Sequence, residues 1–195
     1  NMSLGSYQYS SFENHAIQDA YNSGLLIVAA AGNESTYEPS YPASYNNVIS
    51  VSSTDQDDSD SSFSNYGQYI DIAAPGSNIY STVTKDTYNW MSGTSMATPV
   101  VAGVAALVWA SEPSLTNEQV ANRLISTADD LGPIGKDYYY GNGRINAQKA
   151  LKLAMLTVNS INNTSTSVTG KTEKSATVSV TIGSKIYSAK ADSIG

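Results

Sequence analysis

Short apolar runs alternate with stretches of helical periodicity along the first three quarters of this chain. The runs at 24–32 and 47–54 have the length and composition of buried strands. By contrast, 12–23 and 97–110 repeat their apolar residues at helical spacing. This order is typical of a parallel sheet with crossover helices, so we expect an α/β domain.

The predicted helices carry capping signals at their ends. Ser10 and Ser11 precede the first helix, and Gly24 is positioned to stop it. Further along, Thr116 stands three residues before Gln119, which is the spacing of a capping box. On the first helix we expect one buried face, made of Phe12, Ala16, Ile17 and Ala20.

Charge and composition exclude several classes of function. Residues 1–155 hold six Lys and Arg against fifteen Asp and Glu, so this segment repels phosphate backbones and we expect no nucleic-acid partner. No cysteine is present, which excludes thiol catalysis and Cys-ligated zinc. No run approaches the roughly 20 apolar residues of a membrane span.

The acidic segment 55–62, "DQDDSDSS", is rich in oxygen ligands for a cation. An EF-hand loop starting at Asp55 would need glycine at its sixth position and glutamate at its twelfth. The chain has Asp60 and Tyr66 there, so we interpret the segment as a solvated loop.

Composition changes near residue 155, where Thr, Ser, Val and Asn become frequent in short alternating runs broken by Gly170 and Gly183. We therefore place a domain boundary there, with a first domain at 1–155 and a β-rich segment at 156–195.

The stretch "SGTSMATPVVAGVAALVWAS" places Ser95 at the start of an apolar helix. A helix N-terminus offers free N–H donors and a positive dipole end, which would hold an oxyanion beside the hydroxyl. The alternative is that Ser95 or Thr94 only caps the helix.

Asn33 follows the predicted strand at 24–32, and strand ends of open α/β sheets carry binding sites. A Gly-Asn pair is also an ordinary turn signal. Together, a strand-end Asn33 and a helix-start Ser95 supply two donors for a tetrahedral oxyanion.

Six segments resemble the C-terminal half of a subtilisin-like serine protease, in the family's order over residues 1–155: "NMSLG", "VAAAGNE", "YPASYNNVISV", "IDIAAPG", "SGTSMATPVVAGVAAL" and "YYGNGRINAQKAL". The resemblance implies an α/β fold in which a parallel sheet is flanked by helices. It implies that Ser95 is the acylating nucleophile, with the Asn33 amide and the Ser95 N–H as the oxyanion hole.

The same resemblance implies a substrate groove for an extended peptide or protein chain. Ser3-Leu4-Gly5 would form the wall that pairs with the substrate backbone. The small residues Ala30-Ala31-Gly32 would form the other wall of a pocket for a large apolar side chain. Glu34 at its rim would also admit a basic residue. The expected substrate-binding residues are Ser3, Leu4, Gly5, Ala30, Ala31, Gly32 and Glu34.

No cofactor is expected for catalysis. The family pattern implies a weak structural cation site, for calcium or sodium, at the carbonyls of Ala43, Tyr45 and Val48 with Asp71 nearby. It also places Pro99 in the first helical turn, where a missing N–H costs little.

The family's catalytic Asp and His precede the strand that "NMSLG" represents, so we expect both on sequence upstream of this chain. The single histidine, His15, falls on a predicted surface helix and is not expected to be the base. The chain by itself is then expected to be inactive, and 1–155 to fold poorly, because it lacks the early strands. The whole protein would be secreted or on the cell surface.

Residues 156–195 resemble the start of a bacterial Ig-like domain. Two other functions stay open: a non-catalytic protease-like scaffold for binding or adhesion, and a lipase-type α/β-hydrolase. The lipase reading is disfavoured because its G-x-S-x-G elbow is "GTSMA" here.

Overall fold

The computed structural model describes residues 1–152, 157–159, 167, 169–172, 175–182 and 184–192. The chain forms two compact units, 1–151 and 152–195. The first unit contains all the residues expected to bind or act on a substrate.

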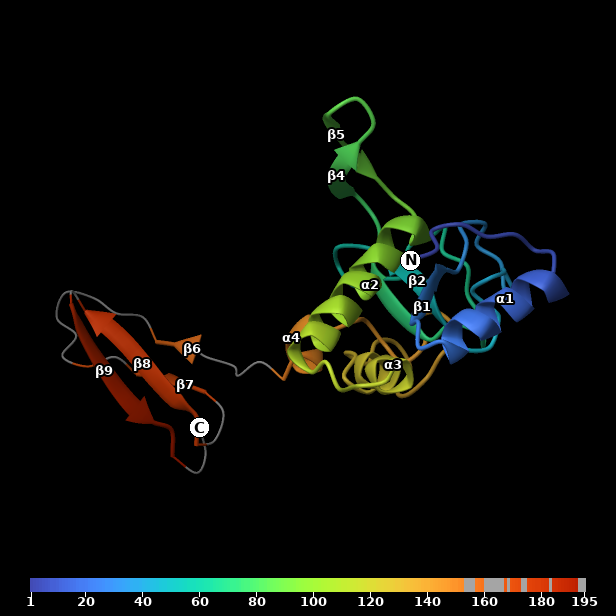
Figure 1. Ribbon diagram of the computed structural model, residues 1–195. Coiled ribbons are helices and arrows are strands. Elements are labelled where there is room, and N and C mark those ends of the chain that lie inside the picture. Colours follow the sequence, from blue (N-terminus) through green and yellow to red (C-terminus); the bar gives the residue numbers. More distant parts are fainter. Residues whose placement is uncertain (153–156, 160–166, 168, 173–174, 183, 193–195) are drawn as a thin grey trace. The chain divides into compact units, whose positions relative to one another are not determined.

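A three-stranded parallel sheet forms the centre of the first unit (Figure 1). Its strands are β1 (Ile27–Ala30), β2 (Val48–Thr54) and β3 (Ile72–Pro75), in that spatial order. All of β1 and β2 is buried, as expected of parallel strands covered on both faces. The predicted α/β architecture is thus present.

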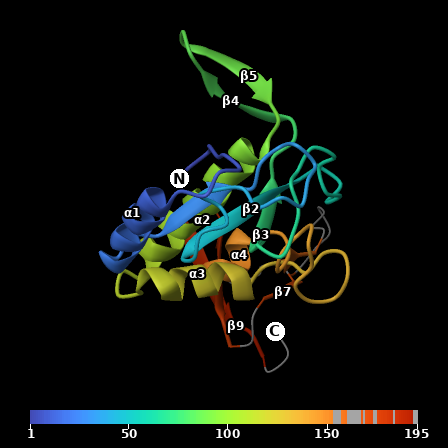
Figure 2. The same ribbon diagram turned by 90° about the vertical axis from the view of Figure 1, so that its right-hand side faces the viewer.

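Helices cover both faces of this sheet (Figures 1 and 2). The long helix α2 (Thr94–Ser111) and α3 (Asn117–Ser126) pack on one face, while α1 (Ser11–Asn22) packs on the other. Successive β1 residues alternate between the two cores, because side chains of a strand point to opposite faces. The α2 side includes Val28, Ile49, Val51, Val101, Val108 and Leu124, and the α1 side includes Ile17, Ile27, Ala29, Ala43 and Val48.

The predicted caps are confirmed. Ser10 Oγ accepts a hydrogen bond from Glu13 N at 3.2 Å, and Thr116 and Gln119 form a reciprocal capping box at α3. The predicted buried face of α1 is only partly correct: Ile17 is buried and Ala20 is partly buried, but Phe12 is 84% exposed and Ala16 is exposed as well. Phe12 lies in the first turn of the helix, five residues before the buried Ile17.

Helix α2 begins three residues earlier than its apolar periodicity indicates, because its first two residues, Thr94 and Ser95, are polar and so fall outside the apolar pattern. Pro99 is therefore its sixth residue and lies in the second turn. The expectation of a first-turn proline was wrong.

By length and composition, α2 could cross a membrane, with a mean hydropathy of 1.4 over 18 residues. It contacts all three strands of the sheet and places Val101, Val104 and Val108 in the core. A core helix meets the same criteria, so we interpret α2 as one.

Two further elements position the site. Met2 bridges to Ala29 in parallel, which brings the N-terminal segment alongside β1. The antiparallel hairpin of β4 (Ile79–Val83) and β5 (Thr87–Met91) leads directly into α2. A short helix, α4 (Ala147–Ala150), follows late in this unit.

The second unit contains two antiparallel pairs. β6 (Thr157–Val158) pairs with β7 (Gly170–Lys171), and β8 (Thr177–Ile182) pairs with β9 (Lys185–Lys190). The β character expected of 156–195 is present where the residues are described. Much of the "TSTSVTG" stretch, quoted for the Ig-like resemblance, lies outside them.

Candidate active site

Three segments of the first unit meet around a cavity of about 210 Å³. They are the N-terminal segment, the loop that leaves β1, and the first turn of α2. The lining residues are Leu4, Gly5, Ser6, Tyr7, Ala30, Gly32, Asn33, Glu34, Ser40, Thr94 and Ser95. Most of the expected site residues are thus brought together.

Ser95 is the second residue of α2 and is partly exposed. Gly93 N-caps the helix without any side-chain bond, so neither Ser95 nor Thr94 occupies the N-cap position considered as the alternative. In the first turn, Thr94 N donates to Asn33 Oδ1 and Met96 N donates to Gly93 O. Within the described part of the chain, the Ser95 N–H has no acceptor, so it is available to an oxyanion.

The Asn33 amide is oriented by Thr94. Its Oδ1 accepts hydrogen bonds from Thr94 N at 2.8 Å and from Thr94 Oγ1 at 3.0 Å. Because a backbone N–H is only a donor, the oxygen must face Thr94 and the amino group must face away from it. Thr94 Oγ1 also accepts from Gly32 N at 3.2 Å, which ties the end of β1 to the start of α2.

Gly32 is required by the backbone at this junction. Its φ is +110°, and a Cβ atom would lie 2.2 Å from Asn65 Nδ2. The buried Asn65 binds the loop from beneath: its Nδ2 donates to Ala31 O at 3.0 Å, and its Oδ1 accepts from Glu34 N at 2.9 Å. These bonds fix the direction in which the loop leaves β1.

The two expected walls differ in how much of their backbone is free. Ala31 is fully buried, its carbonyl accepts from Asn65, and it does not line the cavity. On the opposite wall, Leu4 and Gly5 have no backbone hydrogen bond to any described residue. An added extended strand would therefore pair with Leu4 and Gly5, whereas the Ala30–Gly32 wall supplies shape. Ser3 lies beside this wall and contacts Ser95 directly.

Glu34 does not stand free at the rim of the cavity. Its Oε2 accepts from Tyr7 OH at 2.5 Å, from Asn33 N at 2.8 Å and from Asn65 Nδ2 at 3.4 Å. The hydrogen bond from Tyr7 is the main reason that the pKa of Glu34 lies below its usual range. The pKa of Tyr7 is raised, by burial and by the same bond.

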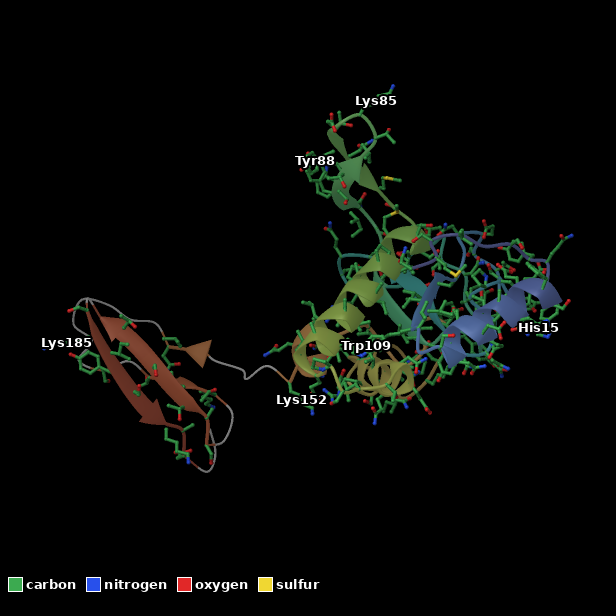
Figure 3. All side chains as sticks on the ribbon, viewed as in Figure 1. His15, Lys85, Tyr88, Trp109, Lys152 and Lys185 are labelled. Carbon is green, nitrogen blue, oxygen red and sulfur yellow. The ribbon has the colours of Figure 1, made fainter. Side chains whose placement is uncertain are left out.

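His15 lies on the exposed surface of α1 and does not line the cavity (Figure 3). It is the only histidine of the sequence. The described residues therefore provide a hydroxyl and oxyanion donors in one place, but no imidazole beside them.

The expected cation ligands Ala43, Tyr45 and Val48 are buried on the α1 side of the sheet. Asp71 lies next to β2, where its Oδ2 accepts from Ser50 N at 3.0 Å and its Oδ1 lies 3.4 Å from Lys136 Nζ. Each carboxylate oxygen of Asp71 thus already has a partner within the protein. Among the residues that the structure describes, no three Asp, Glu or His side chains gather as a metal site.

The model of the subtilase family, Peptidase_S8, matches residues 1–143. The chain belongs to the subtilase family. The parallel sheet, Ser95 and Asn33 all lie within the matched residues.

Named relatives agree with this assignment. The subtilase chain is 48% identical to thermitase of Thermoactinomyces vulgaris over 152 residues, which are 78% of this chain and 53% of thermitase. It is 46% identical to subtilisin BL of Lederbergia lenta, with 78% and 55% covered. The chain spans about half the length of these curated relatives.

The fold of this subtilase is also found in a solved structure. The psychrophilic subtilisin-like protease Apa1 from the Antarctic psychrotroph Pseudoalteromonas sp. AS-11 superposes with a TM-score of 0.72 at 23% identity, covering 77% of this chain and 68% of Apa1. The expected subtilisin-like α/β fold is confirmed.

Sequence reasoning missed several residues of the site. Tyr7, Ser6 and Ser40 line the cavity, and Asn65 holds the Gly32 loop through Ala31, 34 residues earlier in the chain. Thr94 was considered only as a cap, although it orients Asn33. The position of Thr94 directly before Ser95 could have indicated that role. No sequence pattern predicts the contacts of Tyr7 and Asn65.

Proposed function

We propose that the protein is a secreted serine endopeptidase that hydrolyses peptide bonds through an acyl-enzyme on Ser95. The observation that carries the proposal is that Ser95, on the first turn of α2, lines the same cavity as an Asn33 amide whose oxygen is fixed by Thr94. The Asn33 Nδ2 group and the Ser95 N–H would then donate to the oxyanion. The base and its orienting acid, a His and an Asp, would come from polypeptide outside this chain.

The substrate would be an extended polypeptide. Its backbone would pair with Ser3–Gly5, and the side chain before the scissile bond would enter the cavity between Leu4 and Ala30. Small residues on the Ala30–Gly32 wall favour a large apolar side chain. The three donors to Glu34 make a basic side chain the weaker choice.

The test is the intact mass of the native protein before and after reaction with a fluorophosphonate. We expect one adduct, on the peptide that contains Ser95, and none after Ser95→Ala. Exposed Ser59→Ala is the matched control and should label normally. Absence of any adduct on the wild-type protein would contradict the proposal and favour a protease-like scaffold that binds or adheres without catalysis.

The remaining assignments are proposals of the same kind. Residues 156–195 would begin an Ig-like module that acts as a spacer or surface attachment. A weakly held cation, such as calcium, would contact the carbonyls of Ala43, Tyr45 and Val48, with Asp71 nearby. Thermal unfolding with calcium and with a chelator tests this site; equal transitions would contradict it.

A further inference from the structure

Helix α2 lacks one of its backbone hydrogen bonds because of a proline. In an α-helix, the N–H of each residue donates to the carbonyl four residues earlier. The N–H at position 99 would therefore serve the carbonyl of Ser95. Pro99 has no N–H, and its ring crowds that same carbonyl. The residue proposed as nucleophile is thus left without the helical bond that would hold its main chain.

A hydroxyl from outside the helix replaces the missing donor. Ser3 Oγ donates to Ser95 O at 2.8 Å, from 92 residues earlier in the chain. The neighbouring Thr94 carbonyl is also served by a side chain, since Thr98 Oγ1 donates to it at 2.7 Å. Both carbonyls beside the nucleophile are therefore satisfied by hydroxyls.

The hydroxyl of each serine lies near the main-chain carbonyl of the other. Ser95 Oγ lies 3.5 Å from Ser3 O, while Ser3 Oγ binds the main chain of Ser95. Ser3 also directly precedes Leu4 and Gly5, the residues with free backbone groups for a substrate strand. The Ser3 side chain thus links the backbone that would pair with substrate to the helical turn that carries Ser95.

We propose that Ser3 is a positioning residue for Ser95: its hydroxyl replaces the helical hydrogen bond that Pro99 removes and so sets where the Ser95 hydroxyl stands relative to bound substrate. The inference rests on the proposed function, because it assigns a role within that same site. Small misplacements of a reacting group have large effects on rate, so this bond acts on kcat more than on binding.

The experiment is a double-mutant cycle in the full-length protease. Ser3→Ala removes the donor, Pro99→Ala supplies a backbone N–H four residues after Ser95, and the double variant does both. Each protein is assayed for kcat and KM on a peptide anilide, for the rate of fluorophosphonate labelling, and for thermal unfolding. Ser3→Thr keeps the hydroxyl and serves as the conservative variant.

We expect Ser3→Ala to lower kcat roughly three- to tenfold, the range for loss of one hydrogen bond, with little change in KM. Ser3→Thr should recover most of that loss. Pro99→Ala alone should change kcat little. The double variant should regain most of the kcat lost in Ser3→Ala, because the helix now serves the Ser95 carbonyl itself.

Additive effects of the two substitutions would overturn the inference, as would an unchanged kcat in Ser3→Ala. If Ser3→Ala fails to fold, restored folding in the double variant supports the inference and continued failure overturns it. A wild-type protein that neither cleaves nor labels would sink the proposed function instead. The coupling of positions 3 and 99 would then be read from thermal unfolding, where additivity overturns it.

Discussion

The Tyr7 hydroxyl donates to Glu34 Oε2 at 2.5 Å across the mouth of the cavity beside Ser95. Glu34 also accepts from its neighbour Asn33 and from the buried Asn65. The only carboxylate that lines this cavity is therefore held by three donors of the protein, in the part of the chain that the structure describes.

Tyr7→Phe should make Glu34 more available to a basic substrate side chain. We expect the ratio of kcat/KM for lysine over phenylalanine before the scissile bond to rise by about 1.4- to fivefold, in line with the roughly 0.2–1 kcal/mol of an exposed ion pair. Anilide substrates that differ at this residue provide the measurement. Tyr9→Phe, which removes a hydroxyl away from the cavity, is the control. An unchanged ratio would show that Tyr7 does not limit access to Glu34.

The same variant should shift the acid titration of Glu34. Its pKa in the folded protein is lowered, mainly by the Tyr7 bond, so this bond stabilises the fold above the unfolded-state pKa and loses that effect as pH falls through the folded-state pKa. In Tyr7→Phe, the pKa of Glu34 should move up toward its ordinary value. A carboxyl NMR titration of wild type and variant measures the shift; equal midpoints would argue against the bond in solution.

Asn33→Ala should lower kcat about a hundred- to a thousandfold, with KM nearly unchanged, because its amide would donate only as the oxyanion forms. This range is the general one for removing a single oxyanion-hole donor, and it was established in part on a subtilisin. Steady-state kinetics on an anilide substrate measure kcat and KM of the variant, and an unchanged kcat would contradict the role of Asn33. Asn46→Ala, on the exposed loop before β2, should behave as wild type.

Thr94→Val tests whether Thr94 orients the Asn33 amide. Valine keeps the shape of this fully buried side chain but neither donates to Asn33 nor accepts from Gly32 N. We expect kcat to fall roughly tenfold, and stability to fall by about 1–3 kcal/mol, because a Gly32 N–H is left unpaired. Thr94→Ser should restore most of both. A Thr94→Val protein with full kcat would show that the Thr94 N–H alone holds Asn33.

Leu124→Ala should destabilise the first unit by about 2–5 kcal/mol, the cost of a cavity in a close-packed core. Leu124 of α3 is fully buried in the same core cluster as Val101, Val104 and Val108 of α2, whereas Leu107 on α2 is 54% exposed. Leu107→Ala is therefore the matched control and should change stability by less than about 1 kcal/mol. Thermal unfolding of the full-length variants compares the two; equal shifts would contradict the assigned core.

Local patterns in the sequence determined much of the fold. Strands β1 and β2, the caps at Ser10 and Thr116 and the position of α2 were all predictable, because periodicity and capping act between residues close in the chain. The segments around Asn33 and Ser95 were predictable as a pair for a different reason: the topology of a parallel sheet brings strand ends and helix starts to one edge.

Contacts between distant residues were decided only by the tertiary structure. Packing left Phe12 exposed despite its apolar position on α1, and it brought Tyr7 onto Glu34, 27 residues away. The Ser95 carbonyl that Pro99 cannot serve meets Ser3 across 92 residues. Such pairs depend on how whole segments pack, and packing is the sum of many weak contacts that no local pattern of residues encodes.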